Sequence, residues 1–207
     1  MMKIYGSATS PYVRKVRVLI AEKQIACTFV AEDPWQSRAE LHALNPIGKV
    51  PVLEISGSRP LMDSLLIMEY LDAHSGGGRL LPAEGPRRWE ILRWHALGHG
   101  LIDATVVRLL ETRRPEAFQM PERMRREEAR FARIVAAIET EMAAGPWITG
   151  DAPSIADITV GVALSYADFR YPHDWRSTAP RLARWAETMA ARPAFATTLP
   201  PGFTPPG

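Results

Sequence analysis

The 207-residue chain contains a single cysteine, Cys27. One thiol cannot form an internal disulfide framework, and it cannot supply a metal site built from cysteines alone. Cys27 lies in the stretch IACTFV, a predicted strand, where a free thiol behaves as a small apolar residue. We therefore expect Cys27 to be buried and to have no catalytic role.

The sequence also lacks a long apolar run and a large excess of either charge. No segment approaches the ~18 apolar residues of a membrane span, and the first residues do not form the apolar stretch of a secretory signal. The net charge is only +2, and the one basic cluster, Arg14, Lys15 and Arg17, is too short to follow a phosphate backbone. We expect a cytoplasmic protein with no membrane and no nucleic-acid partner, and a basic cluster on a solvated helix face.

What the sequence does contain is two successive patterns of secondary structure, separated by a break rich in glycine and proline. Residues 1–77 alternate short strands with helices, residues 78–85 form a linker, and residues 86–207 show long helical periodicity without a strand signal. The expected strands are 3–5, 27–31, 50–55 and 59–62, and the expected helices are 11–23, 38–44, 64–74, 86–113, 121–144, 154–168 and 179–191. The predicted fold class is therefore α/β plus all-α.

A turn in the stretch ATSPYVRKVR, residues 8–17, leads into the first predicted helix. In dithiol oxidoreductases a turn of this kind carries two cysteines spaced C-P-x-C, but here Ser10 and Val13 occupy the two thiol positions. A hydroxyl cannot exchange disulfides, because that reaction needs a thiolate nucleophile. It can still donate a hydrogen bond to a thiolate that a ligand brings. Ser10 also suits the N-cap of the helix, with Pro11 at its first position.

Two further motifs suit an extended peptide ligand that ends in an α-amino acid. In NPIGKVPVLE, a cis Val50-Pro51 bond would turn the Val50 backbone groups outward to pair with such a ligand; an edge strand protected by proline is the alternative. In MDSLLIMEYL, Asp63-Ser64 precedes a helix whose first N–H groups and Ser64 hydroxyl suit a carboxylate, while Asp63 suits an ammonium. Helix capping by either residue is the alternative.

The stretch DAPSIADITVGVAL has Ser154 three residues before Asp157, which is the spacing of a capping box. In this arrangement the serine hydroxyl and the carboxylate satisfy the backbone N–H groups at the start of a helix. We expect it to have a structural role only.

In this order and at this spacing, the motifs make the chain, up to about Leu199, resemble a cytosolic-type glutathione S-transferase of the serine type, bacterial-like. The resemblance rests on Ser10-Pro11-Tyr12, Lys49 to Leu53, Asp63-Ser64, the linker stretch LLP and the box from Ser154 to Asp157. It implies a thioredoxin-like N-terminal domain that binds glutathione as co-substrate, and an all-helical C-terminal domain with a pocket for a small hydrophobic electrophile. It also implies a homodimer and a role in detoxification.

The resemblance further implies roles for single residues. The Val50 backbone would pair with the cysteinyl unit of glutathione, Asp63 and Ser64 would hold its γ-glutamyl end, and Lys49 would approach its glycyl carboxylate. Asp103, on the helix 86–113, could reach the ammonium of the ligand. One departure is that many members of the family have Glu where Asp63 stands.

Ser10 matches the serine of the serine-type classes and is the predicted donor to the glutathione sulfur. Thr9 and Ser7 on the same turn are alternatives, and so is Tyr5, because tyrosine-type classes keep a phenol at the end of the first strand. Ser10 can act as cap and as catalyst at once.

His95, His99 and Asp103 recur on one face of the helix 86–113 and are of the types that ligate metals. The stretch HALGH lacks the internal glutamate of a zincin, and its glycine favours tight packing, so we expect no metal. The resemblance instead places this helix beside the second-substrate pocket and the dimer axis. Further candidates for that pocket are Tyr12, Val106, Val107 and Tyr166.

The leading prediction is an enzyme that stabilises the glutathione thiolate and conjugates it to a small hydrophobic electrophile. The alternatives are a glutathione-dependent peroxidase or thiol reductase, and a non-catalytic scaffold that binds glutathione or a hydrophobic molecule.

Overall fold

The structure, a computed structural model, describes residues 1–36, 39–171 and 173–206. The chain divides into two compact units: Met1–Ala83 together with Pro193–Phe203, and Glu84–Arg192 together with the last residues. The first unit is thioredoxin-like and the second is helical. The expected helical domain ran from 86 to 207, whereas residues 193–203 belong with the first unit, where they pack against its first helix.

A mixed sheet in the order β2-β1-β3 lies at the centre of the first unit. Its strands are β1 (Met2–Gly6), β2 (Thr28–Ala31) and β3 (Val52–Ile55). β2 runs parallel and β3 antiparallel to β1. Because β3 is antiparallel, its first residue, Val52, lies opposite Tyr5 near the end of β1. The loop before β3 therefore reaches the same edge of the sheet as the turn after β1.

Residues 59–62, predicted to be a strand, form only an isolated bridge between Leu61 and Leu53. The two residues exchange both backbone hydrogen bonds, each 2.9 Å long. Pro60 has no N–H to donate, so the pairing does not extend into a regular ladder. The bridge still runs the segment antiparallel to β3, and this carries Asp63 back toward the start of β3.

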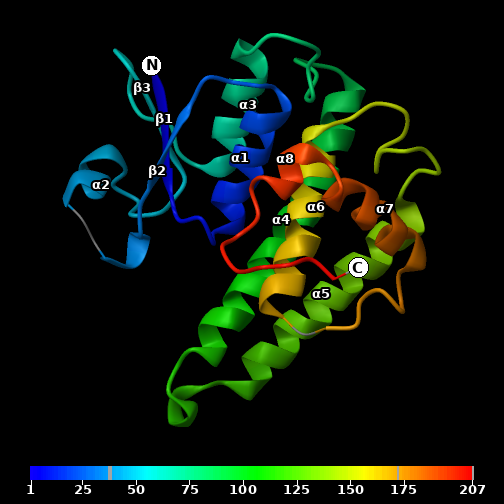
Figure 1. Cartoon of the computed structure of the whole chain (residues 1–207). Helices are drawn as coiled ribbons and strands as arrows, with labels where there is room; N and C mark the ends of the chain where they lie inside the picture. Colours follow the sequence, from blue (N-terminus) through cyan, green and yellow to red (C-terminus); the bar gives the residue numbers. More distant parts are fainter. Residues whose placement is uncertain (37–38, 172, 207) are drawn as a thin grey trace. The chain divides into compact units, whose positions relative to one another are not determined.

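Helices cover both sides of this sheet. α1 and α3 lie side by side on one face, and α2 lies on the other side (Figure 1). The expected helix 38–44 corresponds to α2, and Arg38, its expected first residue, lies outside the described residues. The helical elements of this unit are α1 (Pro11–Glu22), η1 (Pro34–Gln36), α2 (Ala39–Leu44), α3 (Ser64–His74) and α8 (Pro193–Ala196).

The close contact between β1 and α1 fixes where α1 begins. Gly6 ends β1, and a Cβ atom there would clash with the Val13 side chain. Val13 and Val16 are buried as the periodicity predicts, whereas Ile20, expected on the same face, is half-buried. A larger residue at position 6 would push the start of α1, and with it the turn before it, away from the sheet.

A buried ion pair anchors the linker to the first unit. The Asp72 carboxylate on α3 accepts hydrogen bonds from Lys23 Nζ at 2.7 Å and from the N–H groups of Leu80 and Leu81, each at 3.0 Å. The LLP stretch that contributes to the family resemblance is therefore held through its backbone.

The second unit is built around α4, which packs along both α5 and α6 (Figure 1). Gly98 allows α4 and α6 to approach closely, because a Cβ atom there would lie 3.0 Å from the backbone nitrogen of Val160. No helix within the described ranges is long and apolar enough to cross a membrane. The helical elements of this unit are α4 (Pro86–Thr112), η2 (Glu116–Phe118), α5 (Pro121–Glu141), α6 (Ile155–Arg170) and α7 (Pro180–Ala190).

The predicted capping box is present at the start of α6. One Asp157 oxygen accepts hydrogen bonds from the Ser154 N–H at 2.9 Å and from the Ser154 hydroxyl at 2.7 Å, and the other accepts from the Ile148 N–H at 2.7 Å. Burial raises the pKa of the Asp157 carboxyl, and these hydrogen bonds oppose that shift. The box ties the preceding loop to the helix, which is a structural role.

Candidate functional site

Ser10 is the N-cap of α1 and lies directly after the turn that leaves β1. Its backbone is extended, with φ −78° and ψ 126°, and Pro11 takes the first helical position. The Ser10 Oγ accepts a long hydrogen bond of 3.4 Å from the Val13 N–H. Among the described residues, no acceptor takes the hydroxyl proton of Ser10. The half-buried hydroxyl is therefore free to donate to a ligand.

The other three hydroxyls proposed for the sulfur are engaged within the protein. Ser7 Oγ and Thr9 Oγ1 lie 3.1 Å apart and bond to each other. The Tyr5 hydroxyl donates to Glu54 Oε2 on β3 at 2.7 Å. This hydrogen bond, together with partial burial and the negative charge of Glu54, raises the pKa of Tyr5. Tyr5 donates its proton to Glu54, and Ser7 and Thr9 share one hydrogen bond between them, whereas Ser10 donates to no acceptor among the described residues.

The basic cluster at the start of α1 is not solvated, contrary to the prediction from the sequence. Arg14 is 3% exposed and Lys15 is fully buried. Arg14 Nη2 donates to the Phe195 carbonyl oxygen at 3.2 Å, so the returning segment 193–196 helps to cover the helix. Charge pattern within one helix cannot predict a contact with a segment 181 positions away.

Burial affects the electrostatics of these cations. Desolvation, with a smaller repulsion from Arg17, lowers the pKa of Arg14 to about 10. Arg14 thus remains protonated at neutral pH, one helical turn from Ser10. Buried charges are screened less by salt than exposed ones. The start of α1 therefore combines a helix dipole with a buried positive charge, both of which favour an anion.

The loop before β3 is organised by Asn45, whose role the sequence did not reveal. The Asn45 side chain is buried, donates to the Lys49 carbonyl oxygen at 2.7 Å and accepts from the Ile47 N–H at 2.9 Å. The Val50–Pro51 bond is cis. Within the described parts of the chain, the Val50 N–H and C=O make no hydrogen bond, and the Lys49 side chain is exposed.

At the start of α3, Asp63 caps the helix, and the hydroxyl of the next residue, Ser64, is unused among the described residues. Asp63 is the N-cap, and its Oδ1 accepts from the Leu65 N–H at 2.9 Å, so the capping alternative is correct for this residue. Ser64 is 2% exposed, and its hydroxyl has no hydrogen-bond partner among the described residues. The sheet register brings this helix start, the Val50–Pro51 loop and the turn before Ser10 to one edge of the first unit.

The remaining predicted site residue, Asp103, lies on α4 in the second unit. Its Oδ1 is 3.7 Å from His99 Nε2. His95 Nδ1 lies 2.9 Å from the Thr159 hydroxyl on α6, so this histidine contributes to helix packing. Across residues 1–36, 39–171 and 173–206, no group of three or more metal-ligating side chains gathers.

Cys27 precedes β2 and is half-buried, less enclosed than the sequence predicts. Burial raises the pKa of its thiol, and a backbone hydrogen bond with Ile4 opposes the shift. The thiol therefore stays protonated at neutral pH, unlike a catalytic cysteine.

This fold and this arrangement of helix starts match one family on both halves of the chain. A model of the glutathione S-transferase N-terminal domain matches residues 4–79, and a model of the C-terminal domain matches residues 121–188. An Escherichia coli (strain K12) protein named "Uncharacterized GST-like protein YibF" is 32% identical over 97% of this chain and 99% of its own. The chain belongs to the glutathione S-transferase family.

A second relative and a solved structure are also similar to this chain over nearly its whole length. The probable maleylacetoacetate isomerase of Vibrio cholerae serotype O1 is 29% identical over 95% of this chain and 94% of its own. A crystal structure of a glutathione S-transferase from Methylobacillus flagellatus, with glutathione bound, has a TM-score of 0.91 and 35% identity and covers 97% of this chain and all of that one.

Proposed function

We propose that this protein binds glutathione at the edge of its first unit and stabilises the thiolate form. The open backbone groups of Val50 pair with the cysteinyl unit, Asp63 and Ser64 hold the γ-glutamyl end, and Lys49 approaches the glycyl carboxylate. The similar Methylobacillus flagellatus structure, which contains glutathione, supports this choice of ligand.

The observation that carries the proposal is the unused proton of Ser10. A hydroxyl that accepts from a backbone N–H and has no acceptor of its own can donate to a sulfur anion. The Tyr5 hydroxyl donates to Glu54, and Ser7 and Thr9 bond to each other, whereas Ser10 is the N-cap of the helix whose N-terminus favours an anion. We therefore assign the contact with the sulfur to Ser10.

The energies suffice for this role. A free thiol has a pKa of about 8.5, and lowering it by about two units requires about 2.7 kcal/mol of preference for the thiolate. A hydrogen bond to a charged acceptor contributes about 1.5–3 kcal/mol. The helix N-terminus contributes about 0.3–1 kcal/mol. The buried charge of Arg14 acts in the same direction.

The thiolate then attacks an electrophilic carbon of a second substrate. A carbon–sulfur bond forms, and either a leaving group departs or the adduct takes up a proton from water. The helical unit supplies the pocket for this small hydrophobic substrate, and Asp103 assists with the ammonium of glutathione. We further propose that the protein is a cytoplasmic homodimer with a role in detoxification.

A second candidate function is glutathione-dependent isomerisation, which the similarity to the Vibrio cholerae isomerase favours. In that reaction the thiolate adds to a double bond, the adduct rotates about the resulting single bond, and the same thiolate departs. The same Ser10 would serve both reactions, and product analysis separates them, because only conjugation consumes glutathione.

Ultraviolet titration of bound glutathione tests the proposal directly. We expect the thiolate to appear at a midpoint at least about one pH unit below that of free glutathione. Ser10→Ala should return the midpoint most of the way, and the matched control Ser7→Ala should leave it low. A midpoint in the wild-type complex equal to that in buffer would refute the thiolate mechanism. Thiolate formation without conjugation of any halo-aromatic, epoxide or enal would favour peroxide reduction or a binding scaffold.

A further inference from the structure

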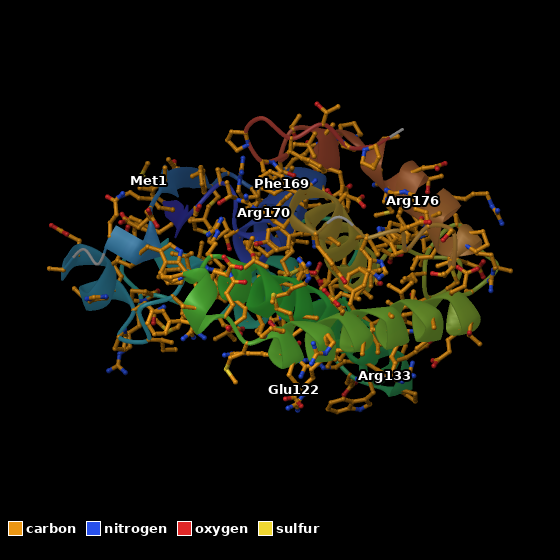
Figure 2. All side chains as sticks on the ribbon, turned by 90° about the horizontal axis from the view of Figure 1, so that it is seen from below. Met1, Glu122, Arg133, Phe169, Arg170 and Arg176 are labelled. Carbon is orange, nitrogen blue, oxygen red and sulfur yellow. The ribbon has the colours of Figure 1, made fainter. Side chains whose placement is uncertain are left out.

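The C-terminal end of α6 carries an arginine, Arg170, with one guanidinium nitrogen that has no hydrogen-bond partner among the described residues. Arg170 lies with its guanidinium carbon 3.8 Å from the centre of the Phe169 ring (Figure 2). Its Nε is buried and has no hydrogen-bond partner within residues 1–36, 39–171 and 173–206. A buried donor without an acceptor is costly, so an acceptor that comes from outside the chain would stabilise this one.

A buried phenol, Tyr166, lies near Arg170, and the charge of a second cation, Arg113, acts on this phenol. Tyr166, one helical turn earlier on α6, is 6% exposed, and its ring meets Phe169 edge-on with centroids 6.4 Å apart. Burial raises the pKa of Tyr166, and the charges of Arg170 and Arg113, together with a hydrogen bond from Arg170, oppose this shift. The phenol therefore remains protonated at neutral pH and can donate a hydrogen bond. Arg113 is the exposed C-cap residue of α4.

These cations have no acidic partner in the parts of the chain that the structure describes. Neither Arg113 nor Arg170 forms an ion pair there. Arg176, also near the end of α6, differs in that both of its terminal nitrogens bond to Asp168 at 2.7 Å. The positive charge at Arg170 is therefore available to a ligand, whereas that at Arg176 is used within the fold.

We propose that Arg170, Tyr166 and Arg113 form a carboxylate-binding subsite for the second substrate. The inference rests on the proposed function, in which the helical unit holds that substrate. A guanidinium and a phenolic hydroxyl together can satisfy the two oxygens of one carboxylate. The Phe169 and Tyr166 rings provide apolar surface for the carbon atoms next to it. The preferred electrophile is then an anionic unsaturated or aryl acid, rather than a purely hydrophobic molecule.

Two glutathione conjugates that differ only in charge test this subsite. S-(2-carboxyethyl)glutathione carries the carboxylate, and its primary amide is neutral and nearly identical in shape. Calorimetric titration of the whole protein with each conjugate gives a ratio of affinities that is independent of the glutathione part. We expect the carboxylate to bind at least about tenfold more tightly than the amide, the scale of a hydrogen bond to a charged group.

Single arginine variants show which residues produce the difference in affinity between the two conjugates. Arg170→Gln should bring the ratio close to one, and Arg113→Gln, at an exposed position, should lower it in part even if Arg170→Gln does not fold. Arg184→Gln is the matched control, an exposed arginine on α7, and should leave the ratio unchanged. Excess acetate or phosphate should compete with the carboxylate conjugate and not with the amide.

The outcomes separate this inference from the proposed function. If glutathione and both conjugates bind and the wild-type ratio is near one, the carboxylate subsite is refuted while the glutathione site stands. A ratio that survives in both Arg170→Gln and Arg113→Gln also refutes it. If glutathione itself does not bind, the proposed function fails, and this inference fails with it.

Discussion

Two helices of this protein begin at a serine N-cap, one in each unit, and they differ in what the hydroxyl proton does. At α6, Ser154 is buried and its hydroxyl donates to Asp157 at 2.7 Å. At α1, Ser10 is half-buried and its hydroxyl accepts from the Val13 N–H without an acceptor of its own among the described residues. The same residue type at the same helical position is satisfied internally in one unit and open in the other.

The difference arises from the residue three positions after each serine. At α6 this residue is Asp157, whose carboxylate completes a capping box. At α1 it is Val13, which cannot accept a hydrogen bond and packs against Gly6 instead. An apolar residue at this position thus leaves the proton of Ser10 for a ligand and ties the helix start to the sheet.

The start of α3 divides these two roles between adjacent residues. Asp63 accepts from the Leu65 N–H and caps the helix, while the Ser64 hydroxyl is unused within the described chain. The comparison therefore predicts that mutating a cap whose hydrogen bonds are all made within the protein lowers stability. Mutating a hydroxyl that is unused within the protein should instead weaken the interaction with glutathione.

The largest expected effect is on stability, from Asp157→Ala. The change removes the acceptor of the buried Ser154 and Ile148 N–H groups and of the Ser154 hydroxyl. We expect a loss of about 3–5 kcal/mol in the free energy of unfolding, because each buried unsatisfied group costs about 1–3 kcal/mol. Urea denaturation followed by circular dichroism measures this loss. Asp151→Ala, at an exposed position before the box, is the control and should cost little.

Ser10→Ala should have the opposite profile. Losing a charge-assisted hydrogen bond of about 1.5–3 kcal/mol lowers kcat/KM by roughly 10- to 150-fold with a halo-aromatic acceptor. The free energy of unfolding should fall by about 1 kcal/mol or less, because the cap bond is long. Steady-state kinetics and urea denaturation of the same preparation measure both effects. A large loss of stability with unchanged turnover would mean that the two serine caps are equivalent.

Ser64→Ala should have a smaller effect, confined to binding. Its hydroxyl makes no contact within the described protein, so the fold loses little, while glutathione loses one hydrogen bond to its γ-glutamyl carboxylate. We expect roughly tenfold weaker glutathione binding by calorimetry, corresponding to about 1.4 kcal/mol. Ser58→Ala, in the exposed turn after β3, is the control. Unchanged affinity would remove Ser64 from the site.

The helix starts could be predicted from the sequence because capping is local. Ser10 with Pro11, Asp63, and Ser154 with Asp157 all act within three residues, and the structure has each of them as a cap. The strand at 59–62 was wrong because a single residue, Pro60, interrupts the pairing that the surrounding apolar pattern favours.

The features that the sequence did not predict depend on contacts between distant segments. Arg14 is covered with the help of Phe195, 181 positions away, so the basic cluster of this helix wrongly predicts a solvated face. Asn45 follows the end of α2, and its side chain also donates to the Lys49 carbonyl oxygen. Only the folded loop reveals this hydrogen bond. The hydrogen bond of the Tyr5 hydroxyl likewise depends on pairing across the sheet, because its acceptor, Glu54, lies on β3.

Tyr5→Phe should therefore have the smallest effect, and it is the sharpest test of the comparison. The phenol donates to Glu54, and its pKa is raised mainly by that hydrogen bond, so it is not positioned to give its proton to a thiolate. We expect the ionisation midpoint of bound glutathione to stay where it is in the wild-type complex, and kcat/KM to change by less than about twofold, a difference of under ~0.5 kcal/mol. A rise of the midpoint toward that of free glutathione would mean that Tyr5 leaves Glu54 when the ligand binds. In that case Tyr5 on β1 would donate to the glutathione sulfur, and Ser10 would only cap its helix, as Ser154 does.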